Sequence, residues 1–383
     1  MSGFTSGIGG FLYVLLPFLF VLTVVVFIHE LGHFLVARWC GVKVKAFSIG
    51  FGREITGFVD KHGTRWRLAW IPLGGYVKFM DDENAASASP SAGAAEMSPD
   101  DREGAFHSKP LWQRAAVVAA GPIANFLLAV VIFALMFSFI GIRSTAPRVD
   151  EVVANSPAAV AGFKAGDVIL EIDGNSVDSF TEVLRTVSGA PGRQLNVKVD
   201  RGGAPYTLQV TPERQEVSDN FGGTIVRGII GIRRLTTPEA LELRKAGPLE
   251  AVWLGVRETN FIITSTLSYI GDVIIGRQRA DQLGGPIRIA EVSGQVAKVG
   301  PEALFNLIAV ISVSVGLINL FPIPLLDGGH LLFYAIEAMR RKPLSERTQE
   351  IGFRIGLALV LMLMVFATWN DRLIVWRWLT GTS

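Results

Sequence analysis

Two histidines and a glutamate stand close together at the end of a long apolar run, where His29, Glu30 and His33 fit the pattern HExxH. On a helix, residues four apart lie on one face, so both imidazoles can bind one Zn²⁺ while the glutamate reaches water beside the metal. Ionisable residues inside a spanning helix are costly, and three in one turn indicate a functional site. The alternative is a solvated helix end that carries these residues by accident.

A third metal ligand must come from elsewhere, because catalytic zinc commonly has three protein ligands and one open position. The single cysteine, Cys40, excludes a cysteine-rich zinc site. The remaining histidines are His62, His107 and His330, and Asp327 is the carboxylate that ends a later apolar run. The membrane topology decides among these candidates and favours Asp327, with His330 as the second choice.

The composition indicates a membrane protein. Of 383 residues, 50% are hydrophobic and 18% charged, which excludes a disordered chain and an ordinary soluble domain. The net charge of +2 gives no basic field, so no nucleic-acid partner is expected. The first apolar run lacks the flanks of a signal peptide and is expected to be retained. Four runs are predicted to span the bilayer: Phe11–Ile28, Arg114–Arg143, Glu302–Asp327 and Ile355–Asn370.

Basic residues crowd the loop after the first span and the loop between the last two spans. They are Arg38, Lys43, Lys45, Arg53, Lys61, Arg65 and Arg67, and then Arg340, Arg341, Lys342 and Arg347. The positive-inside rule places both loops in the cytoplasm and the segment from about Arg143 to Gly300 on the opposite side. The first and third spans then run in the same direction, which brings Asp327 to the membrane depth of His33.

The segment between the second and third spans contains a small β-rich domain. Between Val149 and Val210, β-branched residues alternate with polar ones, with turn signals at Asp173–Gly174 and Gly202–Gly203. The stretch Asn155–Ile169 resembles the PDZ domains of bacterial proteases, which bind extended peptides by adding a strand. The alternative is a domain that only caps or spaces the membrane part. Farther on, Pro248–Gly276 has the pattern of an interfacial amphipathic helix.

Two places within the apolar runs are predicted to interrupt a helix. They are Gly121–Pro122 in the second run and Phe321–Pro324 in the third. Non-helical backbone is tolerated at membrane depth only where it is buried in protein or lines a cavity. We therefore expect both places to border the active-site cavity.

Three signatures occur in order along nearly the whole chain: His29–His33 with Gly50–Gly52 downstream, Gly121–Asn125, and Asn319–Gly329. On these signatures the chain resembles the site-2 proteases, intramembrane zinc metalloproteases of peptidase family M50, and in particular the bacterial regulator-of-sigma-E protease type with a PDZ insertion. One departure is the single PDZ-like unit, where the best-known members of this type carry two.

The resemblance implies specific roles for the residues of the first and third signatures. It implies that His29, His33 and Asp327 ligate zinc and that Glu30 is the general base. No other cofactor is implied. The bound metal would polarise the scissile carbonyl and lower the pKa of water.

The resemblance also implies how a substrate is held. A substrate helix must unwind before cleavage, and each freed backbone group then needs a partner. Asn319 is expected to help hold the unwound substrate. Arg65–Met80, with Gly74 and Gly75 inside it, resembles the family's membrane-reentrant β-hairpin, whose edge could pair with substrate. Asn125 is either a further substrate contact or an amide that packs helices together.

The expected fold is a polytopic α-helical membrane protein with four transmembrane helices, a membrane-reentrant β-hairpin and an inserted extracytoplasmic PDZ-like domain. The first part carries the HExxH helix with the reentrant β region, the second is the second transmembrane helix, and the third is the PDZ-like domain. An interfacial amphipathic segment and the last two transmembrane helices complete the chain. The predicted boundaries are 1–112, 113–143, 144–235, 236–302 and 303–383.

The expected function is that of a zinc endopeptidase in the bacterial inner membrane, with its active site toward the cytoplasm and its PDZ-like domain in the periplasm. By resemblance, its substrates are single-pass membrane proteins: anti-sigma factors after a first extracytoplasmic cut, or signal-peptide remnants. Expected partners are these substrates, the lipid bilayer and a peptide at the PDZ-like domain. One alternative is an inactive PDZ-bearing scaffold or substrate-binding chaperone, which the complete ligand set and Glu30 argue against. A metal transporter is less favoured because the ligands lie at one depth.

Overall fold

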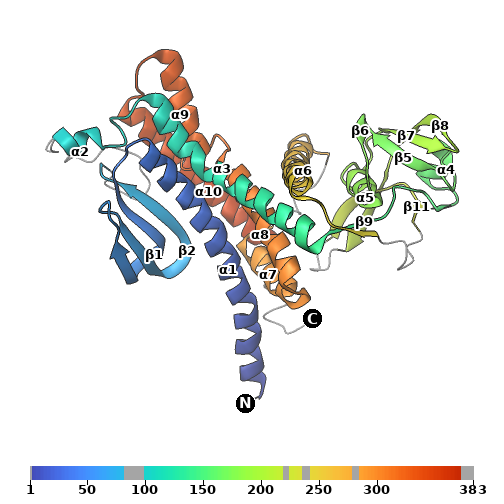
Figure 1. Ribbon diagram of the computed structural model, residues 1–383, viewed down its shortest axis with the longest axis horizontal. Helices are drawn as coiled ribbons and strands as arrows, with labels where there is room; N and C mark the ends of the chain where they lie inside the picture. The colour runs from blue at the N-terminus through green and yellow to red at the C-terminus, as the bar shows by residue number, and fades with distance from the viewer. Residues whose placement is uncertain (1, 82–98, 219–223, 235–241, 278–283, 372–383) are drawn as a thin grey trace. The chain divides into compact units, whose positions relative to one another are not determined.

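The computed structural model describes residues 2–81, 99–218, 224–234, 242–277 and 284–371 (Figure 1). These residues form two compact units, one built mainly from residues 2–133 and 284–371 and the other mainly from residues 134–254. The five-part division expected from the sequence stays a prediction.

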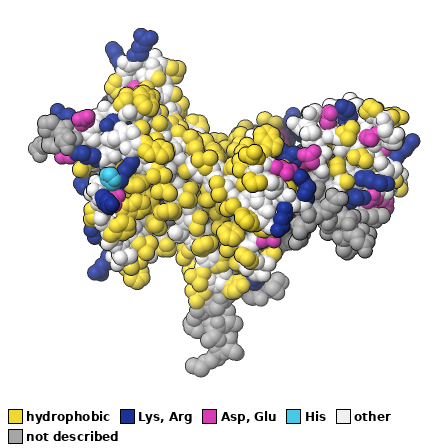
Figure 2. Space-filling view, viewed as in Figure 1, with side chains coloured by type: hydrophobic (Ala, Val, Ile, Leu, Met, Phe, Trp, Pro, Cys, Tyr) yellow, Lys and Arg dark blue, Asp and Glu magenta, His cyan; other side chains and the backbone are white. Residues whose placement is uncertain are grey.

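The first unit is dominated by helices. Three of them, α1 (Ser2–Trp39), α3 (Leu111–Leu135) and α8 (Pro301–Asn319), lie side by side and approach closely at small residues (Figure 1). On the face shown in Figure 2, hydrophobic side chains cover the long helices almost without interruption. The helices are α1 (Ser2–Trp39), α2 (Pro99–Glu103), α3 (Leu111–Leu135), α7 (Pro286–Val299), α8 (Pro301–Asn319), α9 (Asp327–Arg340) and α10 (Glu346–Asn370).

Four helices in the described part of the chain are long and apolar enough to cross a membrane, as the sequence predicts. The first continues past Ile28 to Trp39, so the HExxH motif lies inside the helix and not beyond its end. Helix α3 is prolonged by a short π-helical segment, η2 (Met136–Ile140). The four candidate spans are Leu12–Trp39, Leu111–Ile140, Pro301–Asn319 and Arg347–Asn370.

The predicted interruption at Phe321–Pro324 is present, because α8 ends at Asn319 and α9 begins at Asp327; the third span therefore stops before Asp327 and does not reach it as expected. The prolines of the intervening segment cannot continue the helical hydrogen bonding. The segment folds back over the start of α9: a Cβ on Gly328 would lie 2.3 Å from the Leu320 carbonyl oxygen. Only glycine allows this close approach, and it fixes where Asp327 stands.

The predicted interruption at Gly121–Pro122 is absent, because α3 runs through both residues. Transmembrane helices tolerate proline where neighbouring groups re-satisfy the backbone. Gly121 has a different use, since a Cβ there would lie 2.3 Å from Nε2 of His33. The glycine thus makes room for the imidazoles and does not break the helix.

The connection between α1 and α3 contains a β-hairpin of β1 (Val44–Val59) and β2 (Arg65–Phe79). Both strands bend, and β1 pairs with β2 twice: Phe47 faces both Trp66 and Val77. The segments therefore lie in the order 54–59, 65–71, 44–51, 75–79. This order leaves the segment from Gly75 to Phe79 at one edge of the sheet, and β2 packs against α1. The Ala- and Ser-rich segment Asn84–Pro99 lies outside the described residues except for Pro99.

The second unit contains the predicted β-rich domain, with a four-stranded antiparallel sheet in the order β6 (Asn175–Ser176), β5 (Val168–Ile172), β7 (Leu195–Arg201) and β8 (Ala204–Val210). Both predicted turns are present: Asp173–Gly174 and Gly202–Gly203 have positive φ throughout, as type I′ turns require. The strands are β3 (Ile142–Ser144), β4 (Glu151–Val152), β5 (Val168–Ile172), β6 (Asn175–Ser176), β7 (Leu195–Arg201), β8 (Ala204–Val210), β9 (Glu213–Ser218), β10 (Thr224–Ile229), β11 (Ile232–Arg233) and β12 (Glu242–Arg244). Its helices are α4 (Pro157–Ala161) and α5 (Phe180–Ser188).

The core of this β-rich domain is built by inward-facing residues of β5 and β7, such as Ile169, Val197 and Val199, which are almost fully buried. Ser156 caps α4 by accepting a hydrogen bond from the N–H of Ala159. The predicted amphipathic segment is the long helix α6 (Pro248–Ile274). It is not among the described helices apolar enough to span a membrane, and its interfacial position stays a prediction.

Arg201 is expected to hold this domain together through Asp167. The guanidinium donates to both carboxylate oxygens, at 2.7 and 2.8 Å, and the carboxylate is fully buried. Burial alone would raise the pKa of Asp167, but bonds from Arg201 and the Lys164 N–H lower it below its usual value. Arg201→Met leaves this buried charge unpaired and should destabilise the domain by about 3 kcal/mol. Hydrogen exchange of the β5 and β7 amides in the full-length protein measures this change.

The control for Arg201→Met is Lys198→Met on the same strand. Lys198 pairs with Glu171, but both side chains are more than a third exposed, so this pair is worth at most about 1 kcal/mol. The contribution of the Asp167–Arg201 pair to the free energy of unfolding is fully present above the ordinary carboxyl pKa of about 4. It is lost as pH falls through the lowered pKa of Asp167 in the folded domain. Equal exchange in the two variants at neutral pH contradicts the expected role of Arg201.

Candidate metal centre and active site

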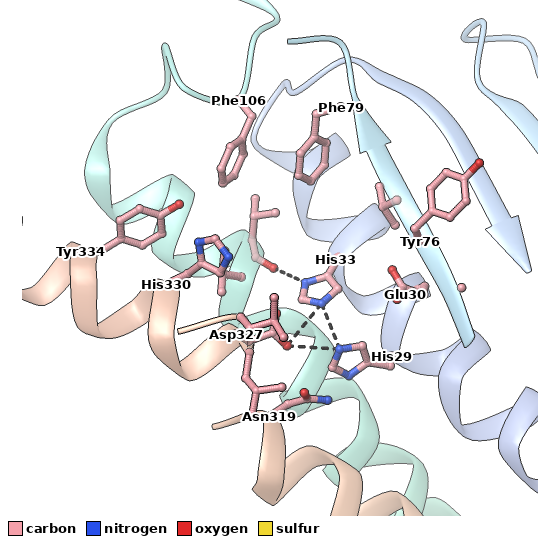
Figure 3. A pocket seen from close by; sticks show the side chains of 16 residues that line it. His29, Glu30, His33, Tyr76, Phe79, Phe106, Asn319, Asp327, His330 and Tyr334 are labelled. Carbon is pink, nitrogen blue, oxygen red and sulfur yellow. Dashed lines mark hydrogen bonds and ion pairs between the residues drawn. The ribbon is translucent and has the colours of Figure 1, made fainter. Parts of the chain in front are cut away.

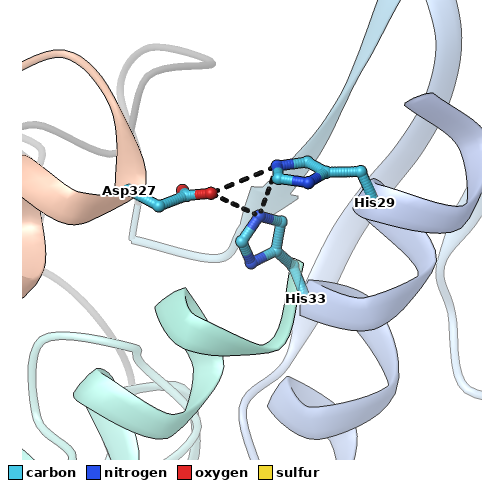
Figure 4. A group of neighbouring side chains, drawn as sticks. All are labelled: His29, His33 and Asp327. Carbon is cyan, nitrogen blue, oxygen red and sulfur yellow. Dashed lines mark hydrogen bonds and ion pairs between the residues drawn. The ribbon is translucent and has the colours of Figure 1, made fainter. Parts of the chain in front are cut away.

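The HExxH motif places its two imidazoles one turn apart on the same face of α1. Their rings meet edge to face, with centroids 4.8 Å apart. The Nε2 atoms of His29 and His33 lie 3.2 Å from each other (Figure 4). Both side chains are largely buried.

Asp327 comes to this pair from the first turn of α9. Its Oδ2 lies 3.2 Å from Nε2 of His29 and 3.6 Å from Nε2 of His33 (Figure 4). The loop Leu320–Leu326 and the glycines that follow Asp327 hold the start of α9 in this place. Two helices far apart in the sequence therefore deliver three donor atoms to one point.

The ring of His33 is fixed from its other side. Its Nδ1–H donates to the carbonyl oxygen of Val117 on α3, at 2.9 Å. A neutral imidazole that donates through Nδ1 keeps a lone pair on Nε2. Nε2 of His33 therefore presents an acceptor, and not a proton, to the other two atoms.

The donor set fits Zn²⁺. Two imidazole nitrogens and one carboxylate oxygen are common ligands of catalytic zinc. Ligand atoms about 2.0–2.2 Å from one centre, at tetrahedral angles, lie roughly 3.3–3.6 Å from one another, which matches the observed 3.2, 3.2 and 3.6 Å. Oδ2 of Asp327 is buried and has no hydrogen-bond donor among the described residues. A cation would satisfy this oxygen together with the lone pair of His33.

Small residues allow the helices to approach closely enough to form the site. A Cβ on Gly32 would lie 2.4 Å from the Ala120 carbonyl oxygen, where α1 meets α3. A Cβ on Gly316 would lie 3.0 Å from the Pro122 carbonyl oxygen, where α8 meets α3. Such close contacts are typical of helices that pack within membranes.

The three donor atoms border a cavity of about 250 Å³ (Figure 3). Glu30 lies on this cavity beside His33, and its carboxylate accepts a hydrogen bond from the Val77 N–H of β2. The cavity is lined by His29, Glu30, His33, Gly75, Tyr76, Val77, Phe79, Phe106, Val117, Val118, Asn319, Leu325, Leu326, Asp327, His330 and Tyr334. A carboxylate beside a three-ligand site has the arrangement needed for general-base chemistry.

The family model described as Peptidase family M50 matches residues 17–363, which is most of the chain. The chain belongs to peptidase family M50. This M50 peptidase is a multi-pass membrane protein by its four apolar helices, and a metalloendopeptidase by its family.

The chain is similar to several known proteins. Atu1380 of Agrobacterium fabrum, named as a zinc metalloprotease, is 52% identical over 97% of both chains. The regulator of sigma-E protease RseP of Salmonella typhimurium is 32% identical over 94% of this M50 peptidase and 98% of its own length. A solved PDZ domain of the SdrC-like protein from Listeria monocytogenes covers 24% of this chain and 88% of its own, at 25% identity and a TM-score of 0.19.

Not all residues that the sequence singled out lie at the cavity of this M50 peptidase. Asn319 and Gly75 line it, but Gly74 does not. His330 lines it without joining the three donor atoms. Asn125, expected either at the substrate or between helices, is fully buried outside the cavity lining, and its amide faces His29.

His107 and the aromatic residues beside it make contacts that stabilise the fold. Nδ1 of His107 lies 2.7 Å from Asp81, which also accepts the backbone N–H groups of Phe106 and His107. Phe106 stacks on Phe79 at the cavity wall. Sequence reasoning missed the carbonyl of Val117 and these aromatics. A backbone carbonyl leaves no signal in the sequence, and aromatic residues at such spacing are common in any core.

Proposed function

We propose that this M50 peptidase is a zinc endopeptidase that cuts single-pass membrane proteins inside the bilayer. His29, His33 and Asp327 hold the zinc, and Glu30 is the general base. One observation carries the proposal: two imidazole nitrogens from a helix apolar enough to span a membrane and a carboxylate oxygen from α9 converge within 3.6 Å. The zinc metalloprotease name of the 52% identical relative supports the choice of metal.

Each residue has a separate task in peptide hydrolysis. Bound zinc supplies positive charge that polarises a peptide carbonyl and makes water more acidic. A Glu30 carboxylate oxygen takes the proton of the attacking water and gives it to the amide nitrogen as the C–N bond breaks. The Val77 N–H of β2 holds this carboxylate at the cavity.

Two features are suited to hold an unwound substrate. The edge segment from Gly75 to Phe79 runs beside the cavity, so it can add a substrate segment as a further strand. Asn319, the last residue of α8, also lines this cavity and offers a side-chain amide to the substrate backbone. Backbone groups released from a substrate helix need such partners in a water-poor site.

The hairpin is proposed to dip into the membrane. Its far segment exposes large apolar side chains, among them Phe58 at 63% and Trp70 at 68%. Exposed apolar clusters of this size are uncommon on protein surfaces that face water. Gly74 is the glycine with positive φ that lets β2 bend just before the cavity edge.

We place the active site toward the cytoplasm and the β-rich domain in the periplasm, because the basic residues gather in the loops near the active site. The proposed substrates are anti-sigma factors already cut outside the membrane, or signal-peptide remnants. A relative named as a regulator of sigma-E protease supports the first class. The β-rich domain is proposed to be a PDZ-like domain that binds a peptide segment by adding it to an edge of its sheet.

Reconstituted proteolysis tests the proposed function. The purified protein is placed in lipid vesicles with a single-pass substrate tagged at both ends, and the cut is located by mass spectrometry. We expect one cut within the transmembrane segment, which a zinc chelator stops and added Zn²⁺ restores. Substrate that is bound but never cut would favour the scaffold instead.

A further inference from the structure

Asn125 is the one polar side chain of α3 that faces the metal site without lining the cavity. It is fully buried, and its Nδ2 lies 3.3 Å from Nδ1 of His29. Its backbone carbonyl accepts a hydrogen bond from Oγ of Ser312 on α8, at 2.8 Å. The residue therefore sits where α1, α3 and α8 meet, directly behind the imidazole that points at Asp327.

The side-chain amide of Asn125 carries a polar atom whose hydrogen bonding is not satisfied within the described part of the chain. Its Oδ1 is buried and has no hydrogen-bond donor among the described residues. A buried polar atom without a partner costs about 1–3 kcal/mol, so such an atom calls for an explanation. The two ends of the amide have nearly the same shape, and a half-turn about the Cβ–Cγ bond exchanges Oδ1 and Nδ2.

The two amide orientations have opposite consequences for His29. If Nδ2–H donates to Nδ1, a neutral His29 carries its proton on Nε2, the atom that faces Asp327 and His33. If Oδ1 faces His29 instead, it accepts the proton of Nδ1–H and leaves the lone pair on Nε2. Only the second orientation makes His29 a metal ligand, and it also gives Oδ1 the donor that it lacks.

We propose that Asn125 is a positioning residue of the metal site, whose Oδ1 accepts Nδ1–H of His29 and so directs Nε2 of this ring to the zinc. Val117 does the same for His33 through its carbonyl. Both imidazoles are then oriented from α3, one by a backbone oxygen and one by a side-chain oxygen. Residues that hold metal-ligating histidines in this way commonly contribute 10- to 100-fold to metal affinity.

The inference rests on the proposed zinc site and is tested by zinc affinity, measured on the full-length protein in detergent by competition with a chromophoric chelator. Asn125→Leu keeps the shape of the side chain but removes its acceptor, and Asn125→Asp keeps an acceptor and removes the donor. We expect Asn125→Leu to weaken zinc binding about 10- to 100-fold and Asn125→Asp to retain wild-type affinity. The melting temperature of each variant is measured alongside.

Matched controls separate the possible outcomes. Ser312→Ala removes the hydrogen bond to the Asn125 backbone and should leave zinc affinity unchanged. Equal loss of affinity in both Asn125 variants would show that the amide acts as a donor, and unchanged affinity in Asn125→Leu would show helix packing alone. Either result overturns the inference. If His33→Ala binds zinc as tightly as the wild type, the proposed zinc site itself fails.

Discussion

Glu30→Gln is expected to lower the rate of substrate cleavage by about 10²–10⁴-fold while zinc stays bound. Glutamine has the same shape but cannot take a proton from water, and its side chain is not one of the three converging donors. The rate is measured with the tagged single-pass substrate in vesicles, and the zinc content is measured in the same preparation.

The matched control for Glu30→Gln is Glu350→Gln on α10. Glu350 is exposed and pairs with Arg354 one turn away, so its loss should leave cleavage unchanged. A Glu30→Gln protein that cleaves as fast as the wild type removes the assigned base. Loss of zinc from that variant would instead make Glu30 part of the metal site.

Gly121→Ala is expected to abolish zinc binding and cleavage together, although it adds a single methyl group. The new Cβ would lie 2.3 Å from Nε2 of His33 and 2.8 Å from Cε1 of His29. Such overlap cannot be relieved by a small adjustment, because α3 is pressed against α1 at Gly32. The imidazoles must turn away, and the three donor atoms then no longer converge.

Gly271→Ala, in the last turn of α6, serves as the control for this substitution. Nothing lies within 4 Å of a Cβ at that position, so the change should be neutral or should favour the helix by up to about 1 kcal/mol. Zinc content and circular dichroism are compared for the two variants. Full zinc occupancy in folded Gly121→Ala would contradict the described packing of α3 against the histidines.

The grouping of the three proposed metal ligands could be reached from the sequence, because each step depends on helical spacing or on loop charge. A four-residue separation on a helix brings His29 and His33 onto one face. The distribution of Lys and Arg sets the direction of the spans, and this direction brings Asp327 to the same end. The structure agrees with this grouping of residues, although Asp327 stands at the start of a new helix and not at the end of a span.

Other features could not be predicted, for physical reasons. Proline at 122 suggested a broken helix, but a packed membrane helix accommodates it. The carbonyl of Val117 has no signature in the side-chain sequence. The position of Asn125 depends on the rotation of α3 about its axis, which the sequence does not specify because the apolar residues surround this helix on all sides.

The pairing of the hairpin strands β1 and β2 could not be predicted from the sequence either. Alternation of side chains predicts β structure but not which segments pair when both strands are long. Residues 46–49 pair on both sides, and this arrangement puts the segment beginning at Gly75 at the edge beside the cavity. Glycine at 75 is required there, since a Cβ would lie 2.8 Å from the Ser48 carbonyl oxygen and 3.1 Å from Cγ of Glu30.

X-ray absorption at the zinc edge of the purified, active protein tests the central claim most directly. The site predicts two imidazole nitrogens and carboxylate or water oxygens at about 2.0–2.1 Å, with no sulfur. Asp327→Ala should remove an oxygen ligand or lower the zinc content. A sulfur ligand at about 2.3 Å, or a spectrum and zinc content that are unchanged in Asp327→Ala, would contradict a metal centre shared by α1 and α9.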